Sequence, residues 1–301
     1  MTERDVRIYE VGPRDGLQNE ETPISTEAKL RFIGLLADAG LREIEATSFV
    51  SPKAIPQLAD AHELMARLDR RPGVRYPVLV PNERGFARAE AAGANAVCVF
   101  TAASEEFTRA NINMTIAASM DAFRPVIVAA RQRGWWSRGY VSTAFGCPYQ
   151  GEVGEAAVVG VAQQLLELGV DELSIGDTIG VAGPADVRRV VGALLGAGIG
   201  AERLAMHFHD TRGTALANVT TALELGIRCF DASTGGTGGC PYAPGAAGNL
   251  ATEDLVYLLE REGLSHGIDL DLLLVAARQV SETLGRPLAT KVGQAGGWRV
   301  P

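Results

Sequence analysis

The sequence has few cysteines, few basic residues and no long apolar run, and each shortage excludes a class of protein. The four cysteines, Cys98, Cys147, Cys229 and Cys240, lie far apart without a CxxC pair, which argues against a disulfide framework and favours a reduced, cytoplasmic protein. The 28 Lys and Arg residues are outnumbered by 36 Asp and Glu residues, for a net charge of -8, so no nucleic-acid partner is expected. No apolar run approaches the roughly 20 residues of a membrane span, and the N-terminal MTERDVRIYEVG has no signal-peptide core.

Glycine, by contrast, is abundant. The chain has 35 glycines among 301 residues, about 12% where roughly 7% is usual, which indicates many tight turns or close backbone approaches. Hydrophobic residues make up 47% and charged residues 21%, the composition of an ordinary globular protein rather than a disordered or fibrous one. We expect a single catalytic domain over residues 1–301.

Short β-rich runs alternate with helical patterns along the chain. The expected strands are 6–11, 43–49, 75–80, 96–101, 139–145, 172–176, 204–209 and 228–233. The expected helices are 26–39, 56–68, 83–92, 117–133, 154–168, 184–195, 214–225 and 251–261. Most strands are continuous apolar runs, as in strands buried on both faces. Eight such units predict an α/β protein with a (β/α)8 TIM-barrel fold, followed by a C-terminal helical extension over about 268–301. A doubly wound open sheet is the alternative, but the first strand is followed by GPRDGLQNE, which lacks the expected Gly-x-Gly-x-x-Gly spacing.

Polar residues crowd the carboxyl ends of these expected strands, where a barrel carries its active site. His207 and His209 form a His-x-His pair at the end of one strand, with both imidazoles on the same face and α-carbons roughly 6.5–7 Å apart. Asp15 can add an oxygen ligand, and such a set suits Mg²⁺ or Mn²⁺. The plainer interpretations are an incidental surface His-x-His pair and an Asp15 that caps a helix or pairs with Arg14.

The segment 235–248 contains six glycines and no charged residue, with Cys240 in its middle. It predicts either a flexible surface loop with an incidental thiol or a mobile lid that carries a reactive group into a closed site. Composition alone leaves both open.

Five motifs resemble the 3-hydroxy-3-methylglutaryl-CoA lyase family over about residues 5–295. They are YEVGPRDGLQNE (9–20), TSFVSPK (47–53), LSIGDTIGV (173–181), HFHDTRGTALAN (207–218) and GGCPYAPGAAGNLATEDLVYLL (238–259). The Arg-Asp-Gly and His-x-His parts are shared with a wider metal-dependent barrel superfamily that includes isopropylmalate and homocitrate synthases. The EVGPRDGLQNE opening and the GGCPYA loop point to the lyase branch.

The resemblance implies a set of site residues and an activity. It implies that the ligands of the divalent ion are Asp15, His207, His209 and Asn249, and that the catalytic residues are Arg14, Glu45 and Cys240. Substrate-binding positions are implied for Glu10, Gln18, Ser48, Tyr140, Ser174, Asp177 and Thr178. The implied reaction cleaves 3-hydroxy-3-methylglutaryl-CoA to acetyl-CoA and acetoacetate with Mg²⁺ or Mn²⁺, and the CoA thioester is substrate rather than cofactor. A homo-oligomer, dimer or tetramer, is expected.

The residue types suit this chemistry. A divalent ion lowers the pKa of the substrate hydroxyl and orients the bond that breaks, and Arg14 can stabilise the enolate that develops on the thioester oxygen. Protons must be removed at one end and added at the other, and Cys240 and Glu45 are the candidates. Whether Cys240 acts as base or as acid stays open.

Some residues depart from the family pattern. Arg212 stands where well-known members have tyrosine, and Glu21 stands where a basic residue would help to hold CoA phosphates. An added cation near the site favours a different acyl-CoA, such as citramalyl-CoA. A Claisen-type acyl transferase is less expected, because such enzymes usually carry a further C-terminal domain, and a non-catalytic barrel would be expected to lose these site residues. Lys53, Arg109 and Asn111 are expected in loops, as weak candidates for CoA binding or as solvated surface residues.

Overall fold

The strands of the protein form one parallel sheet. A computed structural model describes residues 4–239 and 247–298. Within these residues the sheet has nine strands in the order β2-β1-β9-β8-β7-β6-β5-β4-β3, and neighbouring strands pair in parallel. Their bounds are β1 Arg7–Glu10, β2 Glu43–Ile44, β3 Thr47–Ser48, β4 Val78–Leu79, β5 Ala96–Ala102, β6 Trp136–Ser142, β7 Glu172–Asp177, β8 Leu204–Phe208 and β9 Cys229–Ala232.

The first and last strands of this order are two parts of one bent strand. Only Glu45 and Ala46 separate β2 from β3. The Glu45 amide donates to the carbonyl of Glu10 on β1, and the Ala46 amide donates to the carbonyl of Pro77 beside β4. Hydrogen bonding therefore continues on both sides of the interruption and closes the sheet. The nine segments form eight barrel strands, which confirms the predicted (β/α)8 fold.

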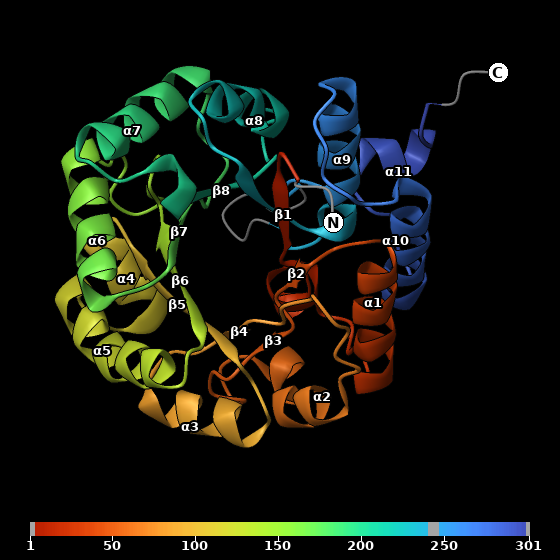
Figure 1. The fold of residues 1–301 in the computed structure, drawn as a ribbon, viewed down its shortest axis with the longest axis horizontal. Helices are drawn as coiled ribbons and strands as arrows, with labels where there is room; N and C mark the ends of the chain where they lie inside the picture. The colour runs from red at the N-terminus through yellow and green to blue at the C-terminus, as the bar shows by residue number, and fades with distance from the viewer. Residues whose placement is uncertain (1–3, 240–246, 299–301) are drawn as a thin grey trace.

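Helices surround the closed sheet, as Figure 1 shows. Their bounds are α1 Thr26–Asp38, α2 Ala61–Arg67, α3 Glu83–Ala91, α4 Glu105–Ile112, α5 Ile116–Gln132, α6 Glu155–Leu168, α7 Pro184–Gly196, α8 Ala215–Glu224, α9 Thr252–Arg261, α10 Leu270–Leu284 and α11 Lys291–Ala295. Short turns of other helix types are η1 Gly12–Gly16, η2 Pro56–Leu58, η3 Ala201–Arg203 and η4 Thr234–Gly236. None of the helices in these ranges has the length and apolar character needed to cross a membrane.

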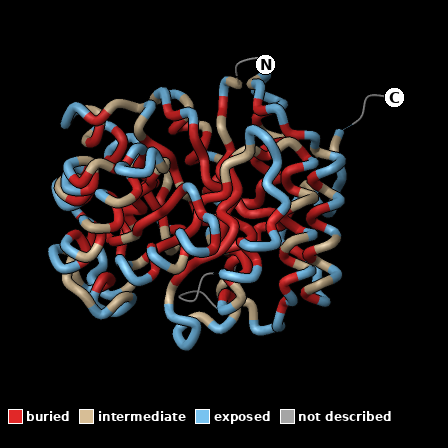
Figure 2. Tube along the Cα trace, turned by 60° about the horizontal axis from the view of Figure 1, so that its bottom comes forward, coloured by how far each residue is buried: buried red, intermediate tan, exposed pale blue. Residues whose placement is uncertain are grey.

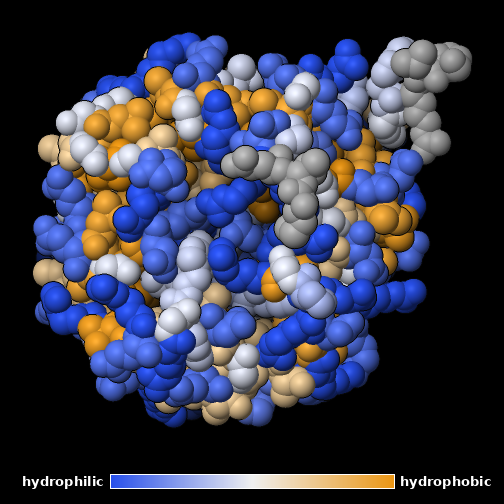
Figure 3. Space-filling model, in the orientation of Figure 1, coloured by the Kyte–Doolittle hydropathy of each residue, from blue (hydrophilic) through white to orange (hydrophobic). Residues whose placement is uncertain are grey.

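The strands have a buried inner and a buried outer face. Figure 2 shows buried residues through the middle of the molecule and exposed ones on the outer helices. Because side chains alternate along a strand, Ile8 packs into the large core between sheet and helices, whereas Tyr9 belongs to a smaller cluster inside the barrel. That inner cluster contains Tyr9, Val11, Leu79, Cys98, Tyr140, Ala205 and Cys229. The face seen in Figure 3 is mainly hydrophilic, with small scattered hydrophobic groups.

Several elements differ from the sequence prediction. The predicted strand 43–49 is interrupted between β2 and β3, the predicted strand 75–80 is reduced to β4, and the predicted helix 56–68 is divided between η2 and α2. Strand β6 begins at Trp136 rather than at residue 139, because Ser137 and the charged Arg138 interrupt the apolar pattern although both are buried. Helix α4 replaces the predicted loop that carries Arg109 and Asn111. The Ser104 hydroxyl caps the helix by accepting a hydrogen bond from the Phe107 amide. A serine cap alone is a weak signal, and this short, mostly polar helix has no apolar pattern to strengthen it.

Candidate active site

The turn after β1 places Arg14 and Asp15 over the end of the barrel. Residues Gly12–Gly16 form η1, a single π-helical turn. In it the carbonyl oxygen of Val11 accepts from the amides of Arg14, Asp15 and Gly16 at 3.2, 2.8 and 3.1 Å. Such turns are rare and frequently lie at functional sites. Here one carbonyl anchors the backbone of both functional residues.

The glycines at the two ends of η1 are required by close packing. A Cβ on Gly12 would lie 2.4 Å from Glu10 Oε1, and one on Gly16 would lie 2.3 Å from Thr237 Oγ1 and 2.6 Å from Ser233 Oγ. Glu10, Ser233 and Thr237 are all buried, so neither position has room for a side chain unless these residues shift. The turn therefore needs glycine at both ends of its Gly-Pro-Arg-Asp-Gly sequence.

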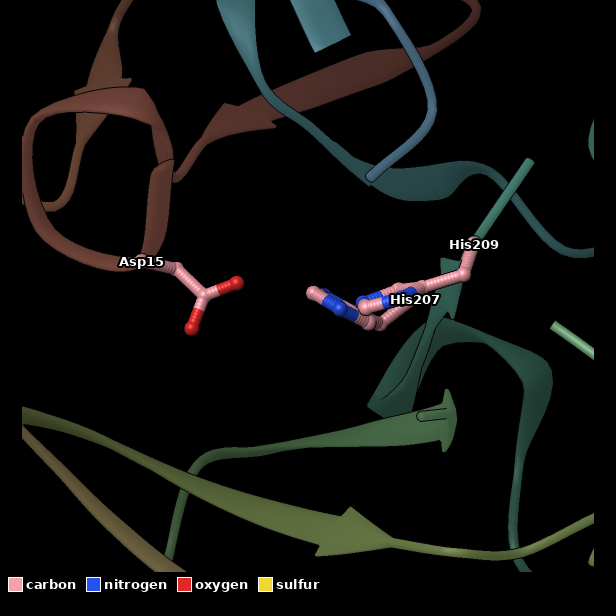
Figure 4. Close-up of side chains that lie close together, drawn as sticks. All are labelled: Asp15, His207 and His209. Carbon is pink, nitrogen blue, oxygen red and sulfur yellow. The ribbon is translucent and has the colours of Figure 1, made fainter. Parts of the chain in front are cut away.

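Asp15, His207 and His209 form a candidate metal site. Their ligand atoms all lie within 4.8 Å of one another, and Figure 4 shows the Asp15 carboxylate facing the two imidazole rings. His207 lies on β8 and His209 follows it, with Phe208 buried in the outer core. The alternation predicted from His-x-His is thus present.

The electrostatics of these residues fit a divalent cation. Burial alone would raise the pKa of Asp15, but the charge of Arg14 and the neighbouring histidines lower it to about 2, so the carboxylate is ionised. Burial and the neighbouring His207 lower the pKa of His209 to about 3, so its imidazole is neutral. His209 Nδ1 is buried and has no hydrogen-bond partner among the described residues. One carboxylate and two imidazoles are a donor set for Mg²⁺, Mn²⁺ or a similar ion.

Asn249 lies beside this site. Its Nδ2 donates to Asp15 Oδ2 at 2.9 Å and to the Thr237 carbonyl at 3.0 Å, and its backbone pairs with that of His209. The predicted ligand role requires the amide oxygen, whereas the amide nitrogen faces Asp15 here. The role stays a prediction, and it requires that the side chain turn over.

Arg14 lies between two carboxylates. Its Nη1 donates to Asp15 Oδ1 at 2.6 Å and its Nη2 donates to Glu45 Oε2 at 2.9 Å. Tyr140 Oη donates to the same Glu45 oxygen at 2.8 Å, and the Tyr140 ring lies 5.5 Å from the guanidinium carbon. Burial raises the pKa of Glu45, and Arg14 offsets only part of this effect. Glu45 is fully buried and does not line the cavity, whereas Arg14 does. Its contact therefore holds Arg14 from the side away from the cavity.

Residues of this site line a cavity of about 620 Å³. Of the sequence-predicted residues, the cavity is lined by Arg14, Asp15, Gln18, Asn111, Tyr140, Ser174, Thr178, His207 and His209. The lining also includes the apolar residues Val50, Ile55, Phe107, Ile112, Met114 and Phe123 and the polar residues Asn19, Ser51, Asn82 and Asn113. A cavity lined by apolar side chains and a few polar groups is typical of a site that binds and orients a small molecule.

Other predicted residues do not line this cavity. Glu10 accepts four hydrogen bonds, from the Gly12 amide and from Thr234 and Thr252. The Asp177 carboxylate accepts from the amides of Val181 and Ala182. Ser48, Lys53 and Arg109 are also absent from the lining: Ser48 is buried, whereas Lys53 and Arg109 are exposed. Cys240 lies outside the described residues.

Sequence reasoning missed a charged group inside the barrel. Asp231 on β9 lies 3.2 Å from His207 Nδ1 and pairs with the fully buried Arg138. The available signal was a charged residue within a run otherwise typical of a buried strand. Such a residue must find a partner, because an unpaired buried charge is very costly.

The fold and the site together define a (β/α)8 barrel with a candidate divalent-metal site at the carboxyl ends of its strands. The chain belongs to the HMGL-like family, whose model matches residues 5–280. It is 50% identical over 288 residues to the hydroxymethylglutaryl-CoA lyase YngG of Bacillus subtilis, covering 96% of each chain.

Solved structures give the same result. The crystal structure of the Bacillus subtilis HMG-CoA lyase matches with a TM-score of 0.95 and 49% identity, covering 97% of this chain and 98% of that one. An HMG-CoA lyase from Acinetobacter baumannii, solved in complex with coenzyme A and 3-methylmalate, matches with a TM-score of 0.93 and 40% identity over the full length of both chains.

Proposed function

We propose that this protein is a divalent-metal-dependent carbon–carbon lyase that cleaves 3-hydroxy-3-methylglutaryl-CoA to acetyl-CoA and acetoacetate. The observation that carries the proposal is the contact of Arg14 with Asp15, which sets an enolate-stabilising cation directly beside a candidate metal ligand. The near-full-length similarity to hydroxymethylglutaryl-CoA lyases supports the same reaction.

The proposed metal ligands are Asp15, His207 and His209, with Asn249 as a fourth. When bound, a divalent ion such as Mg²⁺ or Mn²⁺ supplies a Lewis acid for the substrate hydroxyl. The ionised Asp15 and the neutral His209 are already in the protonation states that binding requires. Burial alone would lower the pKa of His207, but the hydrogen bond and charge of Asp231 raise it, so ion binding at His207 competes with its protonation.

Arg14 is proposed to stabilise negative charge on the thioester oxygen as the carbon–carbon bond breaks. Its guanidinium is held by Glu45 and Asp15, so it need not reorganise during the reaction, which is the condition for effective electrostatic catalysis. Glu45 is fully buried and does not line the cavity, and its Oε2 accepts from Arg14 and from Tyr140. We therefore propose Cys240 as the group that exchanges a proton with the substrate and Glu45 as the residue that positions Arg14.

The cavity is proposed to hold the acyl group beside the metal site and the pantetheine arm along its apolar residues. Asn111 lines the cavity and can bond an amide of the arm. Lys53 and Arg109 lie on segments that flank the cavity, next to the lining residues Ala54 and Ala110, and are exposed. The complex of the Acinetobacter relative with coenzyme A and 3-methylmalate supports a site for a CoA and a branched hydroxy acid. We propose that Lys53 and Arg109 bind the CoA phosphates.

We also propose that the chain acts as a single catalytic domain in the cytoplasm, as a dimer or tetramer. The buried, unpaired thiols of Cys98, Cys147 and Cys229 suit a reducing compartment. Light scattering during size-exclusion chromatography tests the assembly directly, and elution as a monomer would contradict it.

One assay tests the reaction and the substrate together. The purified protein is incubated with 3-hydroxy-3-methylglutaryl-CoA or with citramalyl-CoA, with Mg²⁺ or with a chelator, and the CoA products are separated by chromatography. We expect acetyl-CoA and acetoacetate from the first substrate only with the metal. Cleavage of citramalyl-CoA alone would contradict the proposed substrate, and no cleavage of either would contradict the reaction.

A further inference from the structure

A chain of ion pairs inside the barrel ends at His207. Its centre is Arg138 on β6, which is fully buried. Arg138 Nη2 donates to Asp231 Oδ1 at 2.6 Å, and its Nε lies 3.1 Å from Glu172 Oε1. The guanidinium carbon stacks 3.9 Å from the centre of the Tyr9 ring. The cation is thus held by two carboxylates and an aromatic face, and it cannot turn without losing these contacts.

The two oxygens of Asp231 have different partners. Oδ1 accepts from Arg138, whereas Oδ2 accepts from Ser174 Oγ at 2.8 Å and lies 3.2 Å from His207 Nδ1. A carboxylate beside a buried guanidinium is ionised and can only accept hydrogen bonds. The hydrogen of a neutral His207 therefore lies on Nδ1, which leaves the lone pair of Nε2 available to an ion.

We propose that Asp231 is a positioning residue that selects the Nδ1–H tautomer of His207, and that Arg138 in turn fixes Asp231. The inference rests on the proposed metal site. Carboxylates that orient a metal-binding histidine in this way typically contribute about 10- to 100-fold in metal affinity. Asp231 itself contacts neither the ion nor the substrate in this arrangement.

A purely structural role for Asp231 makes a different prediction. If Asp231 only neutralised Arg138, then loss of the Glu172 carboxylate, which pairs with Arg138 and also with Arg7, should lower the Mn²⁺ affinity at least as much. Glu172 has no contact with His207 among its hydrogen bonds and ion pairs in the described residues. Glu172→Gln is therefore a matched control, since it makes the same carboxylate-to-amide change on the same arginine.

Asp231→Asn should reverse the tautomer. Because Arg138 can only donate, the new amide oxygen must face it, and the amide nitrogen takes the place of Oδ2. That nitrogen donates to His207 Nδ1, which moves the histidine hydrogen to Nε2 and removes the lone pair that the ion needs. We expect the Mn²⁺ affinity of the free enzyme to fall by at least about 10- to 100-fold. Glu172→Gln should bind Mn²⁺ with an affinity close to wild type.

The measurement combines Mn²⁺ equilibrium dialysis with long-range ¹H–¹⁵N spectra of the metal-free protein at about pH 9, where imidazoles are neutral. The chain has only four histidines, and a His207→Gln spectrum identifies the relevant ring. We expect protonated Nδ1 in the wild type and protonated Nε2 in Asp231→Asn.

Protonated Nε2 in the wild type, or wild-type Mn²⁺ affinity in a folded Asp231→Asn variant, would overturn the inference. If that variant does not fold, the tautomer of His207 in the wild type tests the inference by itself. A wild-type protein that binds no Mn²⁺ would instead overturn the metal site of the proposed function, and the role of Asp231 with it.

Discussion

Arg212 Nη1 donates a hydrogen bond of 2.8 Å to the carbonyl oxygen of Ile179. The same nitrogen also donates to the Gly180 carbonyl, and Arg212 is exposed and does not line the cavity. It ties the loop after β7 to the loop after β8 instead of meeting the acyl group. The sequence interpretation of Arg212 as a cation that changes the substrate therefore finds no support in its contacts.

This contact makes a prediction about specificity. Arg212→Tyr should leave the ratio of kcat/KM for 3-hydroxy-3-methylglutaryl-CoA and citramalyl-CoA unchanged, because Arg212 does not line the cavity. Loss of one exposed and one partly buried hydrogen bond should lower the free energy of unfolding by about 1 kcal/mol. Competition assays with both substrates check the ratio, and a change of tenfold or more, about 1.4 kcal/mol, would contradict the assignment.

Arg14→Ala should lower kcat by at least about 10²- to 10³-fold, the usual effect of removing one donor to a developing oxyanion. Asp15 keeps its carboxylate, so Mn²⁺ binding should persist. Single-turnover kinetics and equilibrium dialysis on the same sample separate the two effects. Arg14→Lys is the matched variant and should recover part of the rate, because it restores the charge without the second hydrogen bond. Normal turnover in Arg14→Ala would rule out the catalytic role.

His207→Ala should lose most of its affinity for Mn²⁺, because one of two nitrogen ligands is removed from the candidate site. Equilibrium dialysis with Mn²⁺ measures the loss. His62 on α2 is exposed, so His62→Ala is the control for removal of an imidazole and should bind as the wild type does. Equal Mn²⁺ affinities in His207→Ala and His62→Ala would mean that the ion binds at another site.

The burial of Glu253 predicts that the free energy of unfolding depends on pH. It is fully buried, where burial raises its pKa to about 8, and it accepts from the Gly235 amide. Its folded-state pKa lies above its unfolded-state value, so its protonation stabilises the fold at low pH, and this contribution is lost as the pH rises through about 8.

Glu253→Gln keeps an acceptor for Gly235 but cannot ionise. Between about pH 6 and pH 9 the wild type should lose about 2 kcal/mol more unfolding free energy than this variant does. Denaturant unfolding of both proteins across this range measures the difference. Parallel pH curves would mean that the carboxyl is ionised throughout.

Lys53→Ala and Arg109→Ala should each raise KM for the acyl-CoA severalfold with little change in kcat, as expected when a contact to a remote part of the substrate is lost. The effect should shrink at high salt, because exposed charges are screened. Arg188 on α7 is similarly exposed, and Arg188→Ala should leave KM unchanged. An unchanged KM in the first two variants would mean that other residues bind the CoA phosphates.

The parts of the fold that sequence patterns predict well are those with a single dominant signal. Continuous apolar runs identify buried parallel strands, and the Ser104 start of α4 was missed because a cap alone is a weak signal without an apolar face. His207 and His209 were predicted because their period-two spacing holds in any strand. Asp231 was not, because its partners Arg138 and Ser174 lie on other strands, and only the closed barrel brings them together.

The position of Asp15 depends on the number of residues in η1 as much as on their identity. Three successive amides share the Val11 carbonyl, so the number of residues in the turn sets the direction in which each side chain leaves it. Deleting one residue would swing the carboxylate away from the histidines even if every site residue were kept. Between β1 and Asp15 the chain can therefore exchange some side chains over evolutionary time, but it tolerates no insertion or deletion.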